Sequence, residues 1–284
     1  MSRLLRDLAD FARANNYPLI HAAELREDGE PEVIHMRPAN ACLNCYSIAK
    51  VFTLSAVGLL WDRGLLDLSE RVADILPEVR SAADSRWSAA TVDMALTHRL
   101  GLPKYFLDID AGDPLTFGRD YLRHLLDCPL QCDPGTDRCY SDGAYYLLAR
   151  IVEKRSGMGM DNFLWQELLA PLSFREAAWS HCPMGHTVGA TGLYTRADDV
   201  VRLGALYLHQ GRRQGRQLLS ETWVRTVLER SYELAPMGDG SILGKGGMKG
   251  QMLLLLPERD RVVCWQSYHD RPQEPLVRFC ASWR

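Results

Sequence analysis

Strand-like segments lie only towards the two ends of this 284-residue chain, and helix-like segments fill its middle. Near the N-terminus two such segments flank the turn Asp28-Gly29, and near the C-terminus two flank a turn that begins at Pro257. Neither pair could cover a sheet alone, so we expect the two ends to join in one antiparallel sheet with helices on its faces. The predicted strands are residues 19–25, 33–36, 252–256 and 261–265.

Helical periodicity predicts the remaining elements. The resulting fold class is α/β of the α+β type, in which an antiparallel sheet is flanked by helices and an all-α lobe is inserted. We expect a sheet-containing lobe over 1–65 plus 190–284 and a mainly helical lobe over 66–189, joined as one continuous catalytic unit. A cleft between two lobes is a common place for a site. The predicted helices are residues 4–14, 92–97, 118–126, 142–155, 160–169, 197–209, 220–230 and 276–283.

The bulk composition narrows the classes of partner. A net charge of −3 with 24% charged residues indicates no basic surface for nucleic acid or for a membrane. No window approaches the roughly 18 apolar residues of a membrane span. Residues 1–16 lack the uninterrupted apolar stretch of a secretory signal. We therefore expect a cytoplasmic protein that binds a small-molecule substrate, and the sequence does not indicate its oligomeric state.

Eight cysteines fit that compartment, where thiols stay reduced and are mostly buried. Cys42-x-x-Cys45 and Cys128-x-x-x-Cys132 have spacings that a structural zinc site tolerates. No paired histidine follows them, and several cysteines fall within apolar elements, so buried free thiols are the preferred interpretation. Neither a metal nor a cofactor is expected.

A serine and a lysine stand three residues apart in the S-I-A-K stretch from Ser47 to Lys50. Residues 51–61 are apolar nearly all round a helix, which predicts a core helix that ends near Gly64. Residues three apart are neighbours on a helix surface, so the hydroxyl and the amine share one face. A lysine whose charge is disfavoured by burial can take the proton of a serine nucleophile. The alternative is that Lys50 only extends from the helix end towards solvent.

Lysine is rare in this chain, which has 5 Lys and 28 Arg. Arginine stays protonated in proteins, whereas the charge of a lysine responds to its surroundings. An arginine could therefore not replace a lysine that serves as a base. Lys104 and Lys154 have ordinary surface interpretations. We expect the other three, Lys50, Lys245 and Lys249, to converge on one site.

Four stretches, met in a fixed order along the chain, together carry a resemblance to a known family. They are Ser47–Lys50, residues 96–103 (LTHRLGLP), residues 140–153 (YSDGAYYLLARIVE) and residues 191–198 (TGLYTRAD). The set resembles the penicillin-binding-protein and class C β-lactamase-like serine hydrolases, in the branch of esterases and amide hydrolases. The resemblance implies a β-lactamase/transpeptidase-like fold. His98, within the second stretch, is interpreted as a buried residue that braces a loop rather than as a catalyst.

The third motif of that family, K-T-G or H-x-G on a strand, has two possible registers here. One is Lys245-Gly246-Gly247 and the other is Met248-Lys249-Gly250. The distance to the following turn favours the second register. Glycines suit either, because the carbonyl of a substrate must approach the strand backbone closely.

The resemblance implies a role for each site residue. Ser47 attacks a carbonyl carbon and forms an acyl-enzyme, Lys50 helps to remove the Ser47 proton, and Tyr140 hands a proton to the leaving group. Lys249 stabilises the phenolate of Tyr140. One oxyanion donor is the backbone N–H of Ser47 and the other comes from the segment 248–251. The implied substrate and oxyanion residues are Asp142, Met248, Gly250 and Gln251.

Asp142 departs from the family pattern, which has Asn or Ser at this position. A carboxylate cannot donate to a substrate carbonyl as an amide does, and it repels the carboxylate of a β-lactam. We therefore expect a serine hydrolase of small esters or amides rather than an efficient β-lactamase. The alternative is a penicillin-binding or sensor-type domain that acylates or binds ligand without turnover.

Overall fold

The computed structural model describes residues 1–283, and the chain divides into two compact units. The first unit contains Met1–Val51, Leu168–Ala178 and the chain from Leu193 onward, and the second contains Phe52–Glu167 and Trp179–Gly192. We placed the first boundary after residue 65, whereas the division falls inside helix α2 (Ala49–Asp62). The sequence marks where this helix ends but carries no signal for where its packing partners change.

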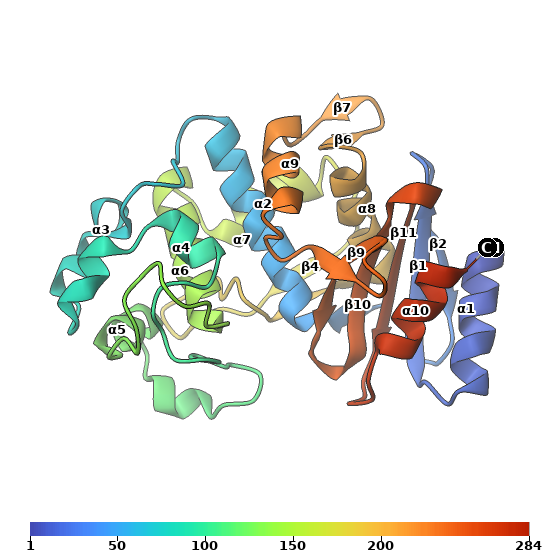
Figure 1. Cartoon of the computed structure of the whole chain (residues 1–284), viewed down its shortest axis with the longest axis horizontal. Coiled ribbons are helices and arrows are strands. Elements are labelled where there is room, and N and C mark those ends of the chain that lie inside the picture. The colour runs from blue at the N-terminus through green and yellow to red at the C-terminus, as the bar shows by residue number, and fades with distance from the viewer. Residues whose placement is uncertain (284) are drawn as a thin grey trace. The chain divides into compact units, whose positions relative to one another are not determined.

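The first unit is built on a six-stranded antiparallel sheet (Figure 1). Its order is β2 (Glu32–His35), β1 (Leu19–Arg26), β11 (Arg261–Ser267), β10 (Gln251–Leu256), β9 (Ile242–Gly247) and β8 (Ala235–Met237). The pairing of β1 with β11 runs from Leu19 opposite Ser267 to Arg26 opposite Arg261. The two ends of the chain therefore share one sheet, and the predicted fold class is confirmed.

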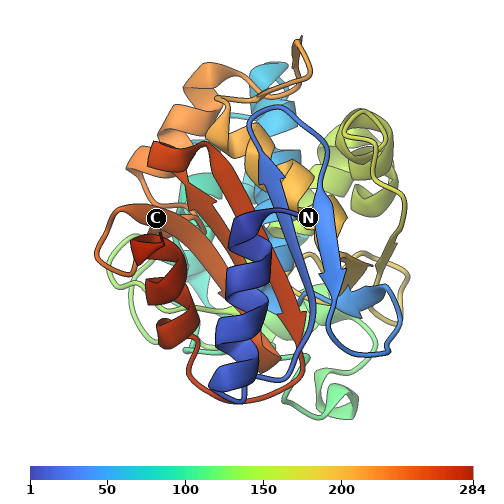
Figure 2. The same ribbon diagram turned by 90° about the vertical axis from the view of Figure 1, so that its right-hand side faces the viewer.

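Helices cover both faces of this sheet. Figure 2 shows α1 (Arg3–Ala14) and α10 (Glu274–Ser282) side by side over one face, where their apolar residues join a core cluster with Leu254 and Trp265. Helix α8 (Ala197–Leu208) lies on the opposite face. Every residue of β10 is buried, as is expected of a strand covered on both sides.

Short elements complete the first unit. A smaller sheet has the order β3 (Cys42–Asn44), β5 (Leu193–Arg196) and β4 (Ala177–Trp179), and the last of these ends at the unit boundary. A hairpin of β6 (Arg212–Arg213) and β7 (Arg216–Gln217) precedes α9 (Glu221–Glu229). Strands of two or three residues have too few alternating positions for their periodicity to be recognised in the sequence.

The second unit is helical and is organised around α6 (Asp142–Ser156). Every residue from Asp142 to Val152 except Arg150 is buried, and the helix contacts α3, α4, α5 and α7. It ends at Gly157, whose left-handed φ of 75° suits a residue without a side chain. The surrounding helices are α3 (Val72–Ile75), α4 (Val92–Leu96), α5 (Tyr121–Asp127) and α7 (Met160–Leu164), and 3₁₀ turns occur at Pro77–Ser81, Ser85–Ala89 and Pro114–Phe117.

Residues 1–283 were expected to bind neither a membrane nor a metal ion. None of their helices has both the length and the apolar character needed to cross a membrane. No group of three or more His, Cys, Asp or Glu side chains in the same range is arranged to hold a metal ion. All eight cysteines are free thiols, and four of them, Cys45, Cys182, Cys264 and Cys280, are buried.

A buried histidine on β1 makes the stability of the fold sensitive to acid. His21 is 2% exposed, its Nε2 lies 2.8 Å from the carbonyl oxygen of Asn40, and its Nδ1 lies 2.9 Å from Nδ1 of His35. Burial lowers the pKa of His21, and the charge of His35 acts in the same direction. The unfolded chain therefore binds more protons than the folded chain below about pH 6.5, so the free energy of unfolding should fall as pH decreases through that value.

We predict that the urea concentration at the unfolding midpoint of the wild type is lower at about pH 5.5 than at about pH 7.5. His21→Gln should lose part of this pH dependence. The matched control is His181→Gln, at a histidine whose side chain is 37% exposed. Equal pH dependence in His21→Gln and in the wild type would contradict the assignment.

Candidate active site

Ser47 lies in a single 3₁₀ turn, Tyr46–Ile48, that leads directly into α2. The sequence predicted it in the first turn of the helix, and the structure places it just before the α-helical hydrogen bonds begin. Tyr46 has a left-handed φ of 48°, and its backbone N–H donates to Oδ1 of Asn44 at 2.9 Å. This bend at the entry of the helix sets the direction in which Ser47 leaves the preceding strand.

The structure brings Ser47 and Lys50 together. Lys50 Nζ donates to Ser47 Oγ at 3.3 Å, and the whole Lys50 side chain is buried while Ser47 is half-buried. Burial disfavours the charged form of an amine, and the neutral form is the one that can accept a proton. A half-exposed hydroxyl next to a buried amine is the arrangement that nucleophilic catalysis requires.

Strand β9 ends against the segment that carries Ser47. A Cβ atom at Gly247 would lie 2.5 Å from the carbonyl oxygen of Cys45 and 3.3 Å from Cβ of Tyr46, so only glycine permits this approach. The next residue, Met248, is 37% exposed. The backbone N–H groups of Ser47 and Met248 therefore belong to two segments in contact, which makes them candidates for an oxyanion-binding pair.

The two registers of the third motif have different places in this hairpin. Lys245-Gly246-Gly247 lies on β9 and pairs with β10. Met248-Lys249-Gly250, the register that the sequence favoured, forms the turn between the two strands, and Lys249 has a φ of 58° there. Which of the two registers takes part in the chemistry stays a prediction.

Both lysines of this hairpin have carboxylate partners. Lys249 Nζ lies 2.9 Å from each carboxylate oxygen of Asp270, and this interaction raises the pKa of Lys249. Lys249 therefore stays a cation and is unsuited to act as a base. Lys245 forms an ion pair with Glu233.

The other two predicted oxyanion residues brace the turn. Gly250 has a φ of 82°, and a Cβ atom there would lie 2.5 Å from Oγ of Ser267. Gln251 is 1% exposed and donates through Nε2 to the carbonyl oxygen of Ser267. These contacts hold β10 and β11 together directly behind the turn that carries Met248.

Tyr140 and Asp142 belong to the second unit. Tyr140 is half-buried, and its carbonyl oxygen accepts a hydrogen bond from the backbone N–H of Tyr105 at 2.7 Å. Asp142 is the first residue of α6 and is 8% exposed, where its carboxylate interacts favourably with the helix dipole. That Tyr140 reaches the Ser47–Lys50 pair stays a prediction.

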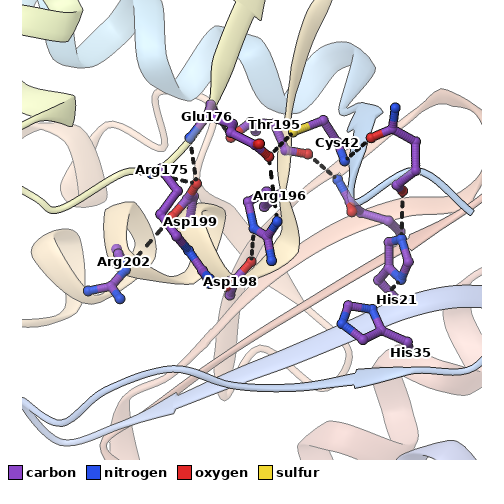
Figure 3. A network of polar contacts seen from close by, with 12 residues as sticks. His21, His35, Cys42, Arg175, Glu176, Thr195, Arg196, Asp198, Asp199 and Arg202 are labelled. Atoms are coloured by element: carbon purple, nitrogen blue, oxygen red, sulfur yellow. Dashed lines mark hydrogen bonds and ion pairs between the residues drawn. The ribbon is translucent and has the colours of Figure 1, made fainter.

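A polar network that the sequence did not reveal braces the strand leading to Ser47 (Figure 3). Cys42 Sγ on β3 donates to Glu176 at 3.0 Å, and Arg196 on β5 lies 3.5 Å from the same carboxylate. Burial, together with Glu176, raises the pKa of the Cys42 thiol to about 12. Cys42 is therefore a hydrogen-bond donor and not a competing nucleophile.

The network continues into the first turn of α8. Asp199 is completely buried and accepts hydrogen bonds from the backbone N–H groups of Arg175 and Glu176, at 3.0 and 3.3 Å. Asp198 pairs with Arg175 and Arg196. The signal for this network was present in the stretch TGLYTRAD and in the Asp199 that follows it, but the arginine and the aspartates were not assigned a role.

A family model matches most of the chain. The model described as Beta-lactamase matches residues 34–276. A curated relative, penicillin-binding protein 4 of Amycolatopsis lactamdurans, is 33% identical over 132 residues, which is 46% of this chain and 34% of the relative. The chain thus matches about a third of the length of the curated relatives.

Solved structures share the fold over nearly the whole chain. A protein assigned as a 6-aminohexanoate-dimer hydrolase from Bacillus anthracis has a TM-score of 0.79 at 17% identity, covering 96% of this chain and 79% of that one. EstCE1, a hydrolase with promiscuous acyltransferase activity, has a TM-score of 0.75 at 15% identity, covering 99% and 98%. At these identities the likeness concerns the fold.

The approach of β9 to Cys45 generates a prediction with a neighbouring control. Gly247→Ala should lower the free energy of unfolding by about 1–3 kcal/mol, because its Cβ would overlap the Cys45 carbonyl oxygen. Gly246→Ala should have a smaller effect, since its nearest neighbour is Cε of Met252 at 3.5 Å. Urea unfolding measures both, and equal effects would show that β9 does not lie this close to Cys45.

Proposed function

This chain belongs to the Beta-lactamase family, and from that premise we propose that it is a serine hydrolase of small esters or amides that works through an acyl-enzyme on Ser47. One observation carries the proposal: the buried Lys50 amine lies 3.3 Å from the Ser47 hydroxyl. No metal or cofactor is needed for this chemistry, which requires only a nucleophile, a base, an oxyanion site and water.

In the first half of the reaction, neutral Lys50 accepts the proton of Ser47 as Oγ attacks the carbonyl carbon. The tetrahedral intermediate places its negative charge on the former carbonyl oxygen. The N–H groups of Ser47 and Met248 would stabilise that charge, and one such donor contributes about 3 kcal/mol in other acyl-transfer enzymes. The intermediate then expels an alcohol or amine and leaves an ester on Ser47.

Tyr140 would pass the proton from Lys50 to the leaving group, and the same groups would activate water in the second half. Water adds to the acyl carbon, gives its proton back along this route, and releases the acid with Ser47 regenerated. Lys249, held as a cation by Asp270, supplies positive charge at the turn beside the oxyanion donors and not a second base. In this mechanism only Lys50, and not Lys249, accepts and gives up a proton.

The substrate class follows from charge and from likeness. Asp142 places a carboxylate at the start of α6, which disfavours substrates that carry a carboxylate there, as β-lactams do. The two structural neighbours reported above are described as hydrolases, one of an amide dimer and one with acyltransferase activity. Uncharged or cationic esters and amides are therefore the proposed substrates.

The second candidate function is a penicillin-binding or sensor domain that acylates at Ser47 without turnover. The observation in its favour is the 33% identity to a penicillin-binding protein over 132 residues. Intact-mass measurement after exposure to penicillin and to a short-chain ester separates the two functions. A lasting adduct on Ser47 without product supports the sensor, and product with at most a transient adduct supports the hydrolase.

For the nucleophile, we predict that the wild type hydrolyses a short-chain p-nitrophenyl ester and reacts with a fluorophosphonate probe. Ser47→Ala should lower kcat/KM by at least about 10³-fold and abolish labelling. Ser55→Ala, at a buried serine on the same helix, is the control and should keep both signals. The proposal is falsified if Ser47→Ala retains wild-type turnover.

For the base, Lys50→Met removes the amine and keeps an unbranched side chain in a fully buried position. We predict a roughly 10²–10⁴-fold loss of kcat with little change in the melting temperature, because the loss is one of proton transfer. Lys154→Met, at an exposed lysine of α6, should have wild-type kinetics. Wild-type kcat in Lys50→Met would exclude this lysine as the base.

A further inference from the structure

Both neighbours of Tyr140 in the sequence are hydrogen-bonded to one residue, His98. The backbone N–H of Cys139 donates to the carbonyl oxygen of His98 at 2.8 Å. The backbone N–H of Ser141 donates to Nδ1 of the His98 ring at 3.2 Å. His98 is 2% exposed, so water does not compete for these bonds. The backbone on each side of Tyr140 is therefore fixed to the same buried residue.

The imidazole ring also contacts the phenol ring of Tyr140. Their centroids lie 4.5 Å apart with an interplanar angle of 37°. The same imidazole contacts Tyr145 of α6 at 5.1 Å and 35°, and the Tyr145 hydroxyl lies 3.4 Å from the carbonyl oxygen of Leu96. His98 thus links the Tyr140 ring to a buried residue of α6.

The loop that carries His98 is itself fixed. His98 follows the end of α4 with a left-handed φ of 56°, a conformation that costs about 1–3 kcal/mol in a residue other than glycine. The carbonyl oxygen of Arg99 accepts from Gly135 N at 2.7 Å, and that of Gly101 accepts from Gln131 N at 2.8 Å. These bonds run along the same segment that leads to Tyr140, so the imidazole cannot shift independently of it.

The hydrogen bonds also define the protonation state that His98 needs. Since Nδ1 accepts from the Ser141 N–H, the neutral ring carries its hydrogen on Nε2. A proton on Nδ1 would face another donor. His98 therefore acts through its shape and its acceptor atom, and it is not a proton carrier.

We propose that His98 is the positioning residue of Tyr140, setting the place of the phenol through ring contact and the direction of its backbone through two hydrogen bonds. This rests on the proposed function, in which Tyr140 transfers the proton to the leaving group. A displacement of about 1 Å in a reacting group costs on the order of 10²-fold in rate. Loss of the ring contact should therefore reduce turnover more than binding.

Two variants separate ring contact from stability. His98→Asn tolerates the left-handed backbone and offers an oxygen to the Ser141 N–H, but it has no ring. His98→Phe keeps a ring and leaves that N–H without its acceptor. We expect His98→Asn to lower kcat for the ester by about 10–100-fold with KM within about twofold, near the wild-type melting temperature. We expect His98→Phe to be less stable yet to retain more of kcat.

His124→Asn is the matched control, because that ring stacks on Phe106 at 5.2 Å and not on a tyrosine of the proposed site. It should leave kcat unchanged. The positioning proposal is overturned if kcat instead follows the melting temperature, so that His98→Phe has a lower kcat than His98→Asn. If His98→Asn does not fold, His98→Phe still tests the proposal. A folded His98→Phe protein whose kcat falls as far as that of Tyr140→Phe would contradict a role for the ring.

A double substitution keeps this proposal apart from the proposed function. In the Tyr140→Phe background, His98→Asn should cause no further loss of kcat, whereas a purely structural role gives losses that multiply. Wild-type turnover in Tyr140→Phe alone would refute the role of Tyr140, and the His98 proposal with it. A large loss in Tyr140→Phe together with full activity in His98→Asn would refute only the His98 proposal.

Discussion

Lys50 is completely buried, and its Nζ reaches Ser47 Oγ across 3.3 Å. The helix that follows is apolar on all sides, so the amine sits where its charged form is disfavoured and its neutral form is useful. The spacing of three residues, at the junction of a 3₁₀ turn and an α-helix, lets a long side chain fold back to the hydroxyl. Every other part of the proposed chemistry depends on this pair, because without it the serine has no base.

The sheet contributes by bringing a second backbone segment to the same place. The pairing of β1 with β11 closes the sheet across the two ends of the chain, and β9 takes its position through β10. Gly247 then allows the end of β9 to touch the residue two before Ser47. Strand pairing between distant parts of the chain thus brings the backbone N–H of Met248 close to the segment of Ser47, whose position is set by the local turn and helix. The proposed site needs both the sheet and the helix.

The sequence predicted those features that repeat over many residues or at a fixed short spacing. The strands at both ends, the main helices and the Ser47–Lys50 pair belong to this class, because periodicity and an i, i+3 spacing are local properties. The short strands β3, β5 and β4 have no such repeat. The unit boundary inside α2 was missed for a related reason, since a continuous helix gives no local sign of a change of neighbours. The sequence did not show which register of the third motif lies on the strand, because the length of the turn between β9 and β10 is set by strand pairing and not by composition.

The five lysines of the chain show how environment and not residue type assigns a role. Lys245 and Lys249 lie within four residues of the close approach at Gly247, and each has a carboxylate partner, which raises the pKa of Lys249. Lys50 is completely buried, with its Nζ 3.3 Å from the Ser47 hydroxyl. Three lysines that look equivalent in the sequence are therefore divided into two that form ion pairs in the hairpin and one that lies buried beside the proposed nucleophile. The division arises because the fold brings Glu233, two residues before β8, and Asp270, three residues after β11, to the hairpin lysines, and the sequence carries no local sign of either contact.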